Sequence, residues 1–392
     1  MQGTDERAYR RSHPWIRFSI DLRRAGAEFW ILLGEARSKT EHLAGSLLKP
    51  EVATEMNQLF LAKGAHATTA IEGNTLSEDD AQQIVAGTLR VPPSQEYLVR
   101  EVVNVVNACN AIKDHLIAGG SGALTVPLIR QFNEQVLEEL GLDPDVRPGQ
   151  TRIHSVTVGR YRGAPAEDCD LLLEELCEWL EGPDFAPPNA EWEIPWALLK
   201  AVIAHLYLAW IHPFGDGNGR TARLMELQIL LAAGMPMPAA HLMSNHYNET
   251  RSEYYRQLDQ ASASGGDVMP FLRYAIRGFV DGIRSQLEYV KAQQFDDRWE
   301  QFIYETFGHT HTAARERQRR LVLELSTLDE PVPRMYLPRL SPELTIAYSG
   351  TERMLSRDIN KLREMGLIER VPEGWQPRRD QLLAFLPIRR TS

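Results

Sequence analysis

A glycine-rich loop between two apolar helical stretches constrains this chain more than any other feature. Residues 212–223 read HPFGDGNGRTAR, and the apolar stretches 195–211 and 220–233 flank them. Three glycines within five positions let successive backbone N–H groups converge, and the helix that follows presents its unpaired N-terminal donors at the same place. The pattern therefore predicts an anion site where a loop joins two helices.

The charged side chains of this loop supply the chemistry that such a site needs. Arg220 and Arg223 are three residues apart on one helix, so they share a face and can grip a polyphosphate from one side. Asp216 can hold Mg²⁺ against the same phosphates, because Mg²⁺ takes one or two carboxylates plus phosphate oxygens. His212 stands at the loop's entry, where it can take a proton from an attacking hydroxyl. This combination indicates phosphoryl or nucleotidyl transfer.

Other phosphate-binding and metal-binding motifs do not fit. Residues 217–222 match a relaxed dinucleotide fingerprint, but an apolar helix and not a strand precedes them, which excludes a Rossmann site. The chain has no Gly-Lys dipeptide, which removes the P-loop, and no HExxH zinc motif. Taken singly, His212 also fits a buried structural histidine and Asp216 an Asx turn. Their combination in one loop favours the catalytic interpretation.

Length and composition predict a soluble protein of two or three domains. Hydrophobic residues make up 43% and charged residues 24% of the 392 residues, the ordinary balance of a folded globular chain. The most apolar helical stretch, 196–211, contains Lys200 and His205, so no window approaches the ~20 uninterrupted apolar residues that a membrane span needs. No apolar region with a cleavage site opens the chain. We therefore expect a cytoplasmic protein without a membrane partner.

Helical periodicity dominates the first 300 residues. The β-formers between 153 and 162 interrupt it and predict a short hairpin. Glycines at 265 and 266 predict a break in the last long helix. Helices are predicted at 24–48, 51–71, 97–117, 168–180, 195–211, 220–233 and 249–295.

The last ~80 residues form a different module. A helix at 313–325, a Pro-rich turn, a helix at 352–365 and short strands at 367–370 and 382–386 follow the order of a winged helix-turn-helix. Residues 310–392 carry 15 Lys/Arg and 11 Asp/Glu, a net +4, whereas the whole chain is −10. The helix at 352–365 carries four basic residues interleaved with three acidic ones. This pattern leaves open whether the module binds DNA or docks a protein or a second copy of the chain.

The loop resembles the HPFxDGNGRxxR signature of Fic-domain proteins (the Fic/Doc family), and every fixed position of that signature is present. The resemblance covers roughly residues 30–290. It implies a mainly α protein, with an all-helical Fic core, a β-hairpin flap and a small C-terminal winged helix-turn-helix domain. The implied domains are an N-terminal helical region at 1–95, the catalytic core at 96–300 and the winged-helix domain at 310–392.

The same resemblance implies an activity and the residues that perform it. Most family members transfer AMP from ATP, with Mg²⁺, to a hydroxyl of a target protein. This makes His212 the general base, Asp216 the Mg²⁺ ligand and Arg223 a grip for phosphates. The hairpin becomes a flap that aligns the target chain by strand addition. The other nucleotide-binding residues implied by the resemblance are Gly217, Asn218, Gly219, Arg220, Asn245, Tyr247 and Tyr254.

A second family feature lies far upstream, in the predicted helix at about 51–73. Residues 68–73, TTAIEG, resemble the (Ser/Thr)xxxGlu(Gly/Asn) inhibitory motif. Thr68 and Glu72 are four residues apart and share a helical face, and Gly73 is a plausible helix stop. The resemblance implies that Glu72 pairs with Arg223 and occupies the position that the γ-phosphate of ATP needs. The leading hypothesis is therefore an autoinhibited protein adenylyltransferase.

Several alternatives stay open from the sequence. Glu72 could activate a water against an AMP-modified hydroxyl, with His212 protonating the leaving oxygen, which would make the protein a de-AMPylase. A nucleotide-sensing, DNA-binding regulator without catalysis is another hypothesis, and transfer of phosphate or phosphocholine is a third. The sequence also leaves open the target protein, what relieves the inhibition, and whether the chain forms a homodimer.

Overall fold

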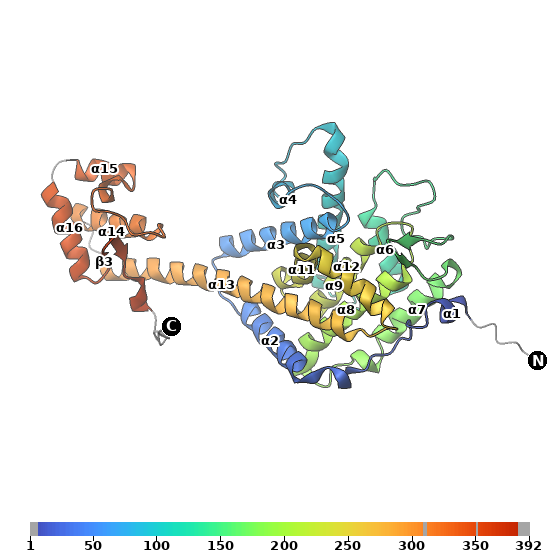
Figure 1. Ribbon diagram of the computed structural model, residues 1–392. Helices are drawn as coiled ribbons and strands as arrows, with labels where there is room; N and C mark the ends of the chain where they lie inside the picture. Colours follow the sequence, from blue (N-terminus) through green and yellow to red (C-terminus); the bar gives the residue numbers. More distant parts are fainter. Residues whose placement is uncertain (1–6, 309–311, 350–351, 383–392) are drawn as a thin grey trace, which may run out of the picture. The chain divides into compact units, whose positions relative to one another are not determined.

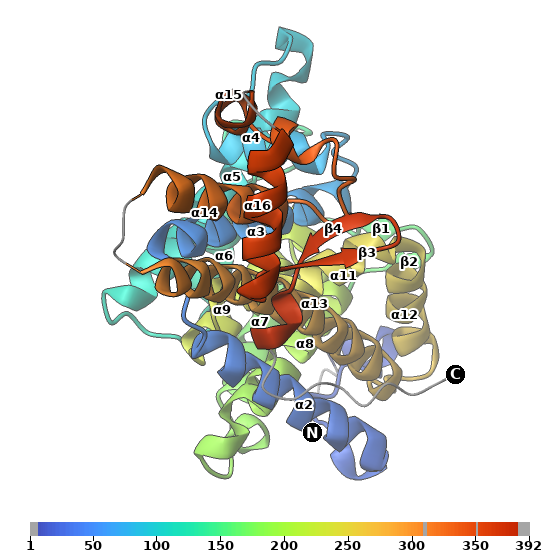
Figure 2. The ribbon, with the colours of Figure 1, turned by 90° about the vertical axis from the view of Figure 1, so that its left-hand side faces the viewer.

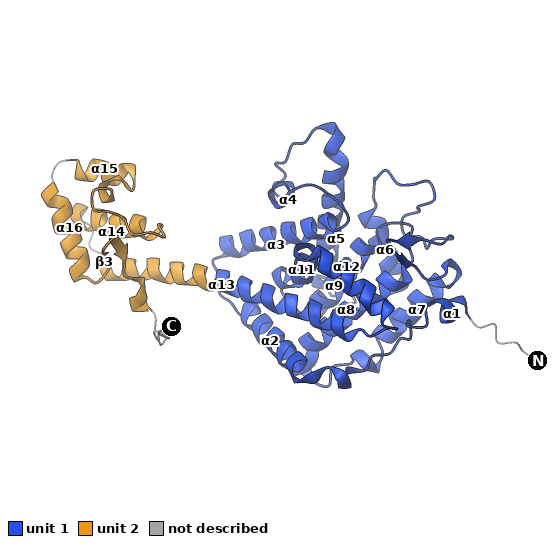
Figure 3. Cartoon of the chain, in the orientation of Figure 1, with its two compact units in different colours: residues 1–290 blue, residues 291–392 orange. Residues whose placement is uncertain are grey.

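The computed structural model describes residues 7–308, 312–349 and 352–382. The chain divides into two compact units, residues 1–290 (unit 1) and residues 291–392 (unit 2), which Figure 3 draws in different colours. Each unit buries a hydrophobic core of its own. The described part of the predicted N-terminal region, up to about residue 95, contributes side chains to the core of unit 1.

Unit 1 is built from helices and one small hairpin (Figure 1). This confirms the mainly α fold class, and the break predicted at 264–266 separates two long helices. The elements in chain order are α1 (Ala8–Ser12), α2 (Gly26–Ala44), α3 (Pro50–Ala70), α4 (Glu78–Val85), α5 (Glu96–Ile117), α6 (Val126–Val136), β1 (Thr157–Val158), β2 (Tyr161–Arg162), α7 (Cys169–Leu180), α8 (Glu193–Ile211), α9 (Asn218–Ala232), α10 (Met237–Ala240), α11 (Leu242–Glu249), α12 (Arg251–Ala263) and α13 (Met269–Phe307), which continues into unit 2.

The core of unit 1 forms around α8 and α9, which pack along each other. α8 is apolar on every side and almost entirely buried, as expected of a helix that its neighbours cover on all faces. The stretch Ala190–Ile211 is long and apolar enough to cross a membrane, but 78% of the tested window is buried inside the protein. α8 is thus the central core helix of unit 1, and the glycine-rich loop starts from a rigid support.

The predicted hairpin is present as β1 and β2, which pair antiparallel with Val158 opposite Tyr161. Its strands have two residues each because Gly159, with φ of 60°, turns the chain at once. The hydroxyl of Tyr161 donates to the carbonyl oxygen of Trp210 in α8 (2.7 Å). This bond anchors the hairpin beside the loop.

The predicted inhibitory helix is α3. It begins at Pro50, which has no N–H to leave unpaired at a helix start. It ends at Ala70, and Gly73 then turns the chain with φ of 105°. α3 packs against α4, α5 and α11, and it also contacts α9. The C-terminal end of α3 therefore belongs to the surroundings of the loop.

Unit 2 contains three helices and a hairpin among its described residues (Figure 2). The hairpin lies beside α16, and the end of α13 adds Trp299, Ile303 and Phe307 to the core. Unit 2 consequently starts near residue 291, before the predicted 310. The helices at 313–325 and 352–365 and the hairpin follow in the predicted order, α15 is an additional helix between the two, and the assignment to the winged-helix class stays a prediction. The elements are α14 (Ala313–Ser326), α15 (Pro342–Tyr348), α16 (Glu352–Glu364), β3 (Ile368–Val371) and β4 (Gly374–Pro377).

The second strand of this hairpin is not where the sequence places it. The prediction at 382–386 is wrong at Leu382, which ends a short 3₁₀ helix, and residues 383–386 lie outside the described part of the chain. A two-residue turn after Val371 brings Gly374 opposite it, so β4 starts almost immediately. Trp375 then also bridges to Val332.

Candidate functional site

The glycine-rich loop joins α8 to α9 through two left-handed residues. His212 ends α8 with φ 50° and ψ 57°, and Gly217 precedes α9 with φ 75°. A non-glycine residue rarely adopts this conformation, and such strain concentrates at functional sites. The imidazole of His212 leaves the helix at this point and lines a cavity.

Asn218 holds the loop closed on itself. Its Oδ1 accepts from the backbone N–H of Phe214 (3.0 Å), and its Nδ2 donates to the carbonyl oxygen of the same residue (2.9 Å). Phe214 is fully buried beneath the loop. Asn218 therefore shapes the predicted phosphate nest with its side chain, while its backbone stands at the start of α9.

His212 is held in its neutral form. Burial, and after it the positive charge of Arg152, lower the pKa of its imidazole to about 4. Arg152 is itself buried and donates from Nε to the carbonyl oxygen of His212 (2.7 Å). A neutral imidazole can accept a proton at physiological pH, which suits the role predicted for His212.

Asp216 and Arg220 lie together at the start of α9. Asp216 Oδ1 accepts from the backbone N–H of Gly217 (2.5 Å) and from Arg220 Nη2 (3.2 Å). The side chain of Arg220 is buried and also contacts Glu101 (3.5 Å), whereas that of Asp216 remains 50% exposed. Asp216 therefore offers a solvent-facing carboxylate next to the anion site.

Arg223 is a buried arginine whose partners come from a distant segment, the C-terminal end of α3. Its Nη2 donates to Glu72 Oε1 (2.6 Å), across 151 positions of sequence, and to the carbonyl oxygen of Thr68 (2.8 Å). Its Nε and Nη1 have no hydrogen-bond partner among the described residues. Because buried donors are normally satisfied, Arg223 keeps capacity for a further anion.

The carboxylate of Glu72 lies directly against the first turn of α9. A Cβ at Gly219 would come within 2.1 Å of Glu72 Oε1, so only glycine permits this approach. Burial by itself would raise the pKa of Glu72, but the charge and hydrogen bond of Arg223 outweigh it and lower the pKa. Glu72 is thus an anion at a helix N-terminus, the place where such a helix attracts anions.

Two residues of α12 fasten the segment that carries Glu72. The carbonyl oxygen of Ile71 accepts hydrogen bonds from Arg251 and from the hydroxyl of Tyr255 (3.0 Å for Tyr255). A cationic donor is favourable at this end of a helix, where the carbonyls of the last turn lack intrahelical partners. The sequence does not mark these residues, because contacts across about 180 positions leave no local pattern.

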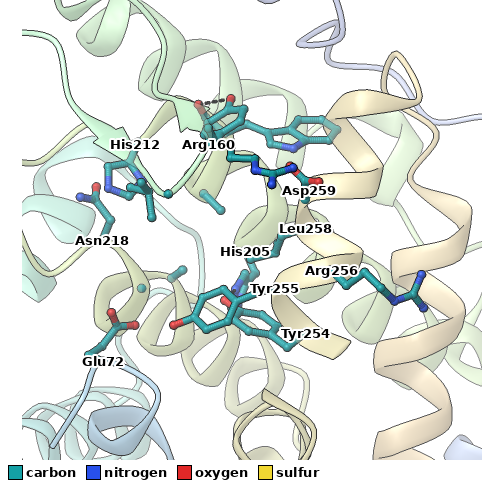
Figure 4. A pocket seen from close by; sticks show the side chains of 17 residues that line it. Glu72, Arg160, His205, His212, Asn218, Tyr254, Tyr255, Arg256, Leu258 and Asp259 are labelled. Atoms are coloured by element: carbon teal, nitrogen blue, oxygen red, sulfur yellow. Dashed lines mark hydrogen bonds between the residues drawn. The ribbon is translucent and has the colours of Figure 1, made fainter. Parts of the chain in front are cut away.

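A cavity of about 580 Å³ lies beside the loop. Glu72, His212 and Gly219 line one part of it, and the hairpin lines another. Figure 4 shows Tyr254 and Tyr255 of α12 across this space from His212. The predicted base, the Glu72 carboxylate and an aromatic surface therefore face one space of nucleotide-binding size.

Of the three residues predicted for an adenine pocket, Tyr247 and Tyr254 lie together with stacked rings (centroids 4.8 Å apart), and Asn245 lies elsewhere. Tyr254 lines the cavity and shares a hydrogen bond with His205 (2.8 Å). Tyr247 is fully buried and donates from its hydroxyl to Glu226 (2.9 Å). Asn245 lines a different cavity, between α3, α11 and α13. Of the three, the structure brings Tyr254 to the site.

Other residues that hold the loop are not evident from the sequence. Arg152 donates its backbone N–H to the carbonyl oxygen of Pro213, and its guanidinium donates to the carbonyl oxygens of His212 at the start of the loop and of His154 and Ala164 on the two sides of the hairpin. Asn133 of α6 donates to the carbonyl oxygen of Asp216 (2.9 Å) and accepts from the N–H of Gly149 (3.0 Å). A lone Arg or Asn outside any motif gives no pattern that could have identified it.

The side chains of the loop fit Mg²⁺ only when a bound polyphosphate supplies further ligands. Among the described residues, no group of three His, Cys, Asp or Glu side chains could hold a metal ion. Asp216 supplies one half-exposed carboxylate beside a predicted phosphate nest. Mg²⁺ commonly takes one or two carboxylates and completes its shell with phosphate oxygens and water, so the residues present fit that ion together with a bound polyphosphate.

Comparisons with known proteins agree with this geometry. The model of the Fic/DOC family matches residues 123–230, which run from α6 through the hairpin and the loop into α9. Protein adenylyltransferase fic-1 of Caenorhabditis elegans is 29% identical over 243 residues, 62% of this chain and 44% of that protein. Protein adenylyltransferase Fic of Nematostella vectensis is 31% identical over 210 residues, 54% of this chain and 45% of that protein. The chain thus spans less than half the length of these curated relatives.

Solved structures show the same fold. A Fic family protein from Desulfovibrio desulfuricans superposes with a TM-score of 0.57 at 21% identity, covering 91% of this chain and 97% of that one. Fic-1 from C. elegans gives a TM-score of 0.54 at 26% identity, covering 67% of this chain and 72% of that one. The first likeness extends over nearly the whole of both chains.

Proposed function

Because this chain carries a Fic/DOC family domain, we propose that it is an autoinhibited protein adenylyltransferase that transfers AMP from ATP to a hydroxyl of a target protein and of itself. The names of the curated relatives support AMP transfer. One observation carries the proposal: the anion Glu72 is held at the N-terminus of α9 by Arg223, in the same cavity as the neutral His212.

In the proposed reaction, the target hydroxyl attacks the α-phosphorus of ATP while His212 accepts the hydroxyl proton. A new oxygen–phosphorus bond forms, the bond from the α-phosphorus to the oxygen that bridges to the β-phosphate breaks, and pyrophosphate leaves. The backbone N–H groups of residues 217–219 and the guanidinium of Arg220 orient the phosphates. Mg²⁺, held by Asp216 when bound, supplies charge neutralisation at the α- and β-phosphates.

Glu72 restrains this reaction through Arg223. As long as Nη2 of Arg223 donates to Glu72 and Thr68, that nitrogen is not available to the γ-phosphate, and the Glu72 carboxylate repels an incoming triphosphate. ATP then binds with its phosphates displaced. Displacement is costly, because an error of ~1 Å in a near-attack geometry can lower a rate ~10²-fold.

The hairpin supports a role in target binding. It lies at the cavity through Val158, Gly159 and Tyr161, and Val158 is 46% exposed. A two-stranded ribbon has open edges, so an extended segment of the target can add to it as a further strand. This would place the target hydroxyl close to His212.

Incubation with ATP and Mg²⁺ tests the function directly. The full chain and its Glu72→Gly variant are each given ATP labelled at the α-phosphate or at the γ-phosphate, with His212→Ala in the Glu72→Gly background as the control. The proposal predicts covalent label from the α-phosphate alone and none in the control. Label from the γ-phosphate alone would replace it with kinase-like chemistry, and no label from either form of ATP would reject it.

Removal of AMP is a second candidate, and the exposure of Glu72 favours it. Its side chain is 35% exposed and its pKa is lowered, so the carboxylate can activate a water in the cavity of His212. The oxygen of that water would form the new bond to phosphorus, and His212 would return a proton to the leaving hydroxyl. Under this hypothesis Glu72→Gly loses AMP removal as it gains AMP transfer, which an AMP-modified chain as substrate would reveal.

A further inference from the structure

A second cavity of about 440 Å³ lies in unit 1 between α3, α11 and α13. It shares no lining residue with the cavity beside the loop. Lys63 and Ala67 of α3 line it, and Ala67 is directly followed by Thr68, whose carbonyl oxygen accepts from Arg223. α3 therefore forms a wall of this cavity and also carries Thr68, one partner of Arg223, while Glu72, the other partner, lies two residues after the helix ends.

Three buried polar atoms of this cavity's lining residues have no hydrogen-bond partner within the described part of the chain: Asn245 Oδ1, His246 Nε2 and Gln286 Oε1. Gln286 is only 2% exposed, and its Nε2 donates to the carbonyl oxygen of Pro238 (2.7 Å). That bond fixes the orientation of the Gln286 amide, so Oε1 is the amide atom that has no partner among the described residues. Because an unpaired buried acceptor costs free energy, these oxygens mark a place for a donor.

The charges around the cavity are mostly negative. Lys63 is the one Lys or Arg among its lining residues, and Glu78 neutralises it at 3.2 Å. Glu249 and Asp281 add two more carboxylates, of which Asp281 also contacts Arg284 (2.7 Å). Because Lys63 pairs with Glu78 and Arg284 pairs with Asp281, Glu249 is the lining carboxylate that remains to attract a cation.

The unpaired groups of the two cavities have opposite chemistry. Beside the first cavity, in the first turns of α9, the N–H donors of Arg220 and Arg223 that lack a partner among the described residues suit an anion. In the second cavity they include amide oxygens, joined by carboxylates, and these suit a ligand with N–H donors. A metal ion suits the second cavity poorly, since no cluster of three His, Cys, Asp or Glu among the described residues could hold one.

We propose that the second cavity binds a small organic cation with several N–H donors, of the linear diamine class. The ammonium groups pair with the carboxylate of Glu249 and with the amide oxygens of Asn245 and Gln286. Leu59 and Phe60 of α3 supply apolar surface for the methylene chain. Nothing in the proposed AMP transfer uses these residues.

A ligand bound in the second cavity also affects α3. This consequence rests on the proposed function. The cavity is formed in the conformation where Glu72 holds Arg223, and a ligand that binds one conformation stabilises it. A bound diamine therefore favours the restrained state and lowers self-labelling from ATP.

Calorimetric titration of the full chain with 1,4-diaminobutane tests the site, and succinate, a dicarboxylate with the same carbon number, is the ligand control. We expect diamine binding tighter than about 1 mM and no binding of succinate. Glu249→Gln should weaken diamine binding about fivefold, and Gln286→Met should weaken it as well. Glu288→Gln, an exposed change on α13 outside the cavity, is the matched control and should bind as wild type does.

No diamine binding by the wild-type chain, or equal loss in Glu249→Gln and Glu288→Gln, overturns the site. Because this titration does not use AMP transfer, it decides the matter even if the proposed function fails. Self-labelling with and without 1,4-diaminobutane then tests the consequence for α3. An unchanged rate at saturating diamine overturns the regulatory part of the proposal.

Discussion

Each unit contains an arginine–carboxylate pair with a 2.6 Å contact, and the two pairs differ in how fully they are bonded. In unit 2, Asp358 is 2% exposed and accepts from Arg317 (2.6 Å), Gln318 (2.6 Å) and the hydroxyl of Tyr348 (3.0 Å). Three donors thus satisfy one carboxylate. These contacts join α14, α15 and α16. The carboxylate of Asp358 is already occupied by its three donors and is not open to a ligand.

In unit 1, the corresponding pair is incomplete on both sides. The side chain of Glu72 keeps 35% exposure, and Arg223 keeps two nitrogens without a partner. A saturated pair stabilises one arrangement of helices, whereas an incomplete pair beside a cavity can exchange its carboxylate for another anion at modest cost. The difference separates a structural pair from a regulatory one.

The largest expected effect concerns His212, the proposed base of the reaction that the Glu72–Arg223 pair is proposed to restrain. His212→Ala in the Glu72→Gly background should lower AMP transfer by about 10²–10⁴-fold, because it removes the base. ATP affinity should change little, since the imidazole adds no phosphate contact. Label transfer and calorimetric ATP binding check both points, and retained transfer would refute the assignment of His212 as the base.

The next effect tests the saturated pair. Asp358→Ala should destabilise unit 2 by about 3 kcal/mol, because it leaves Arg317 and two other donors without their acceptor. Glu72→Ala should cost unit 1 only about 1 kcal/mol, because the cavity lets water replace the carboxylate. Hydrogen exchange of the amides in each unit measures the two losses separately.

Glu364→Ala is the matched control for this comparison. Glu364 lies on α16 as Asp358 does, but it is exposed, and its ion-pair partner among the residues that the structure describes is Lys361 (3.3 Å). We expect a change below about 0.5 kcal/mol. Equal losses for Asp358→Ala and Glu72→Ala would remove the distinction between the two pairs.

A smaller effect is expected for Asp216, whose carboxylate lies beside the predicted phosphate nest. Asp216→Ala should weaken Mg²⁺-dependent ATP binding by about tenfold or more, since the predicted metal site then loses its carboxylate ligand. Binding of ATP without Mg²⁺ should weaken far less. A Mg²⁺ titration that does not differ from wild type would take Asp216 out of the metal site.

The smallest effect is a change in pH dependence. Burial and Arg152 lower the pKa of His212 to about 4, and the base must be neutral to act, so activity is present above that pKa and lost below it. An ordinary imidazole, with pKa about 6.5, would be only about one-tenth neutral at pH 5.5. Transfer by Glu72→Gly should therefore stay nearly constant from pH 7 to pH 5.5. A tenfold fall over that range would mean that His212 is not desolvated.

The sequence predicts what local patterns determine. The motif at 212–223 and most helices follow from glycine placement and apolar periodicity, and in the structure residues 212–217 form the loop between α8 and α9. The hairpin near Tyr161 follows from β-formers around a glycine. These features depend on neighbours within a few positions, so one sequence contains the information.

Contacts between distant segments are not predictable in the same way. The pairing of Glu72 with Arg223 is expected only through the resemblance to a family, and Arg152 and Asn133 belong to no motif. The sequence did not predict the strand at Gly374–Pro377, because its position depends on a two-residue turn rather than on the apolar run at 382–386. Asn245 lies on α11, and the position of that helix places it at the second cavity. The spacing of residues along the chain could not predict this placement.

The central claim is that Glu72 keeps Arg223 from the nucleotide. Self-labelling from α-labelled ATP, measured side by side for wild type and Glu72→Gly, tests it most directly. We expect Glu72→Gly to be faster by one or more orders of magnitude, Glu72→Gln to be faster by less, and Arg223→Ala to be inactive in either background. Equal rates for wild type and Glu72→Gly would contradict the claim and leave Glu72 as an ordinary residue at the end of a helix.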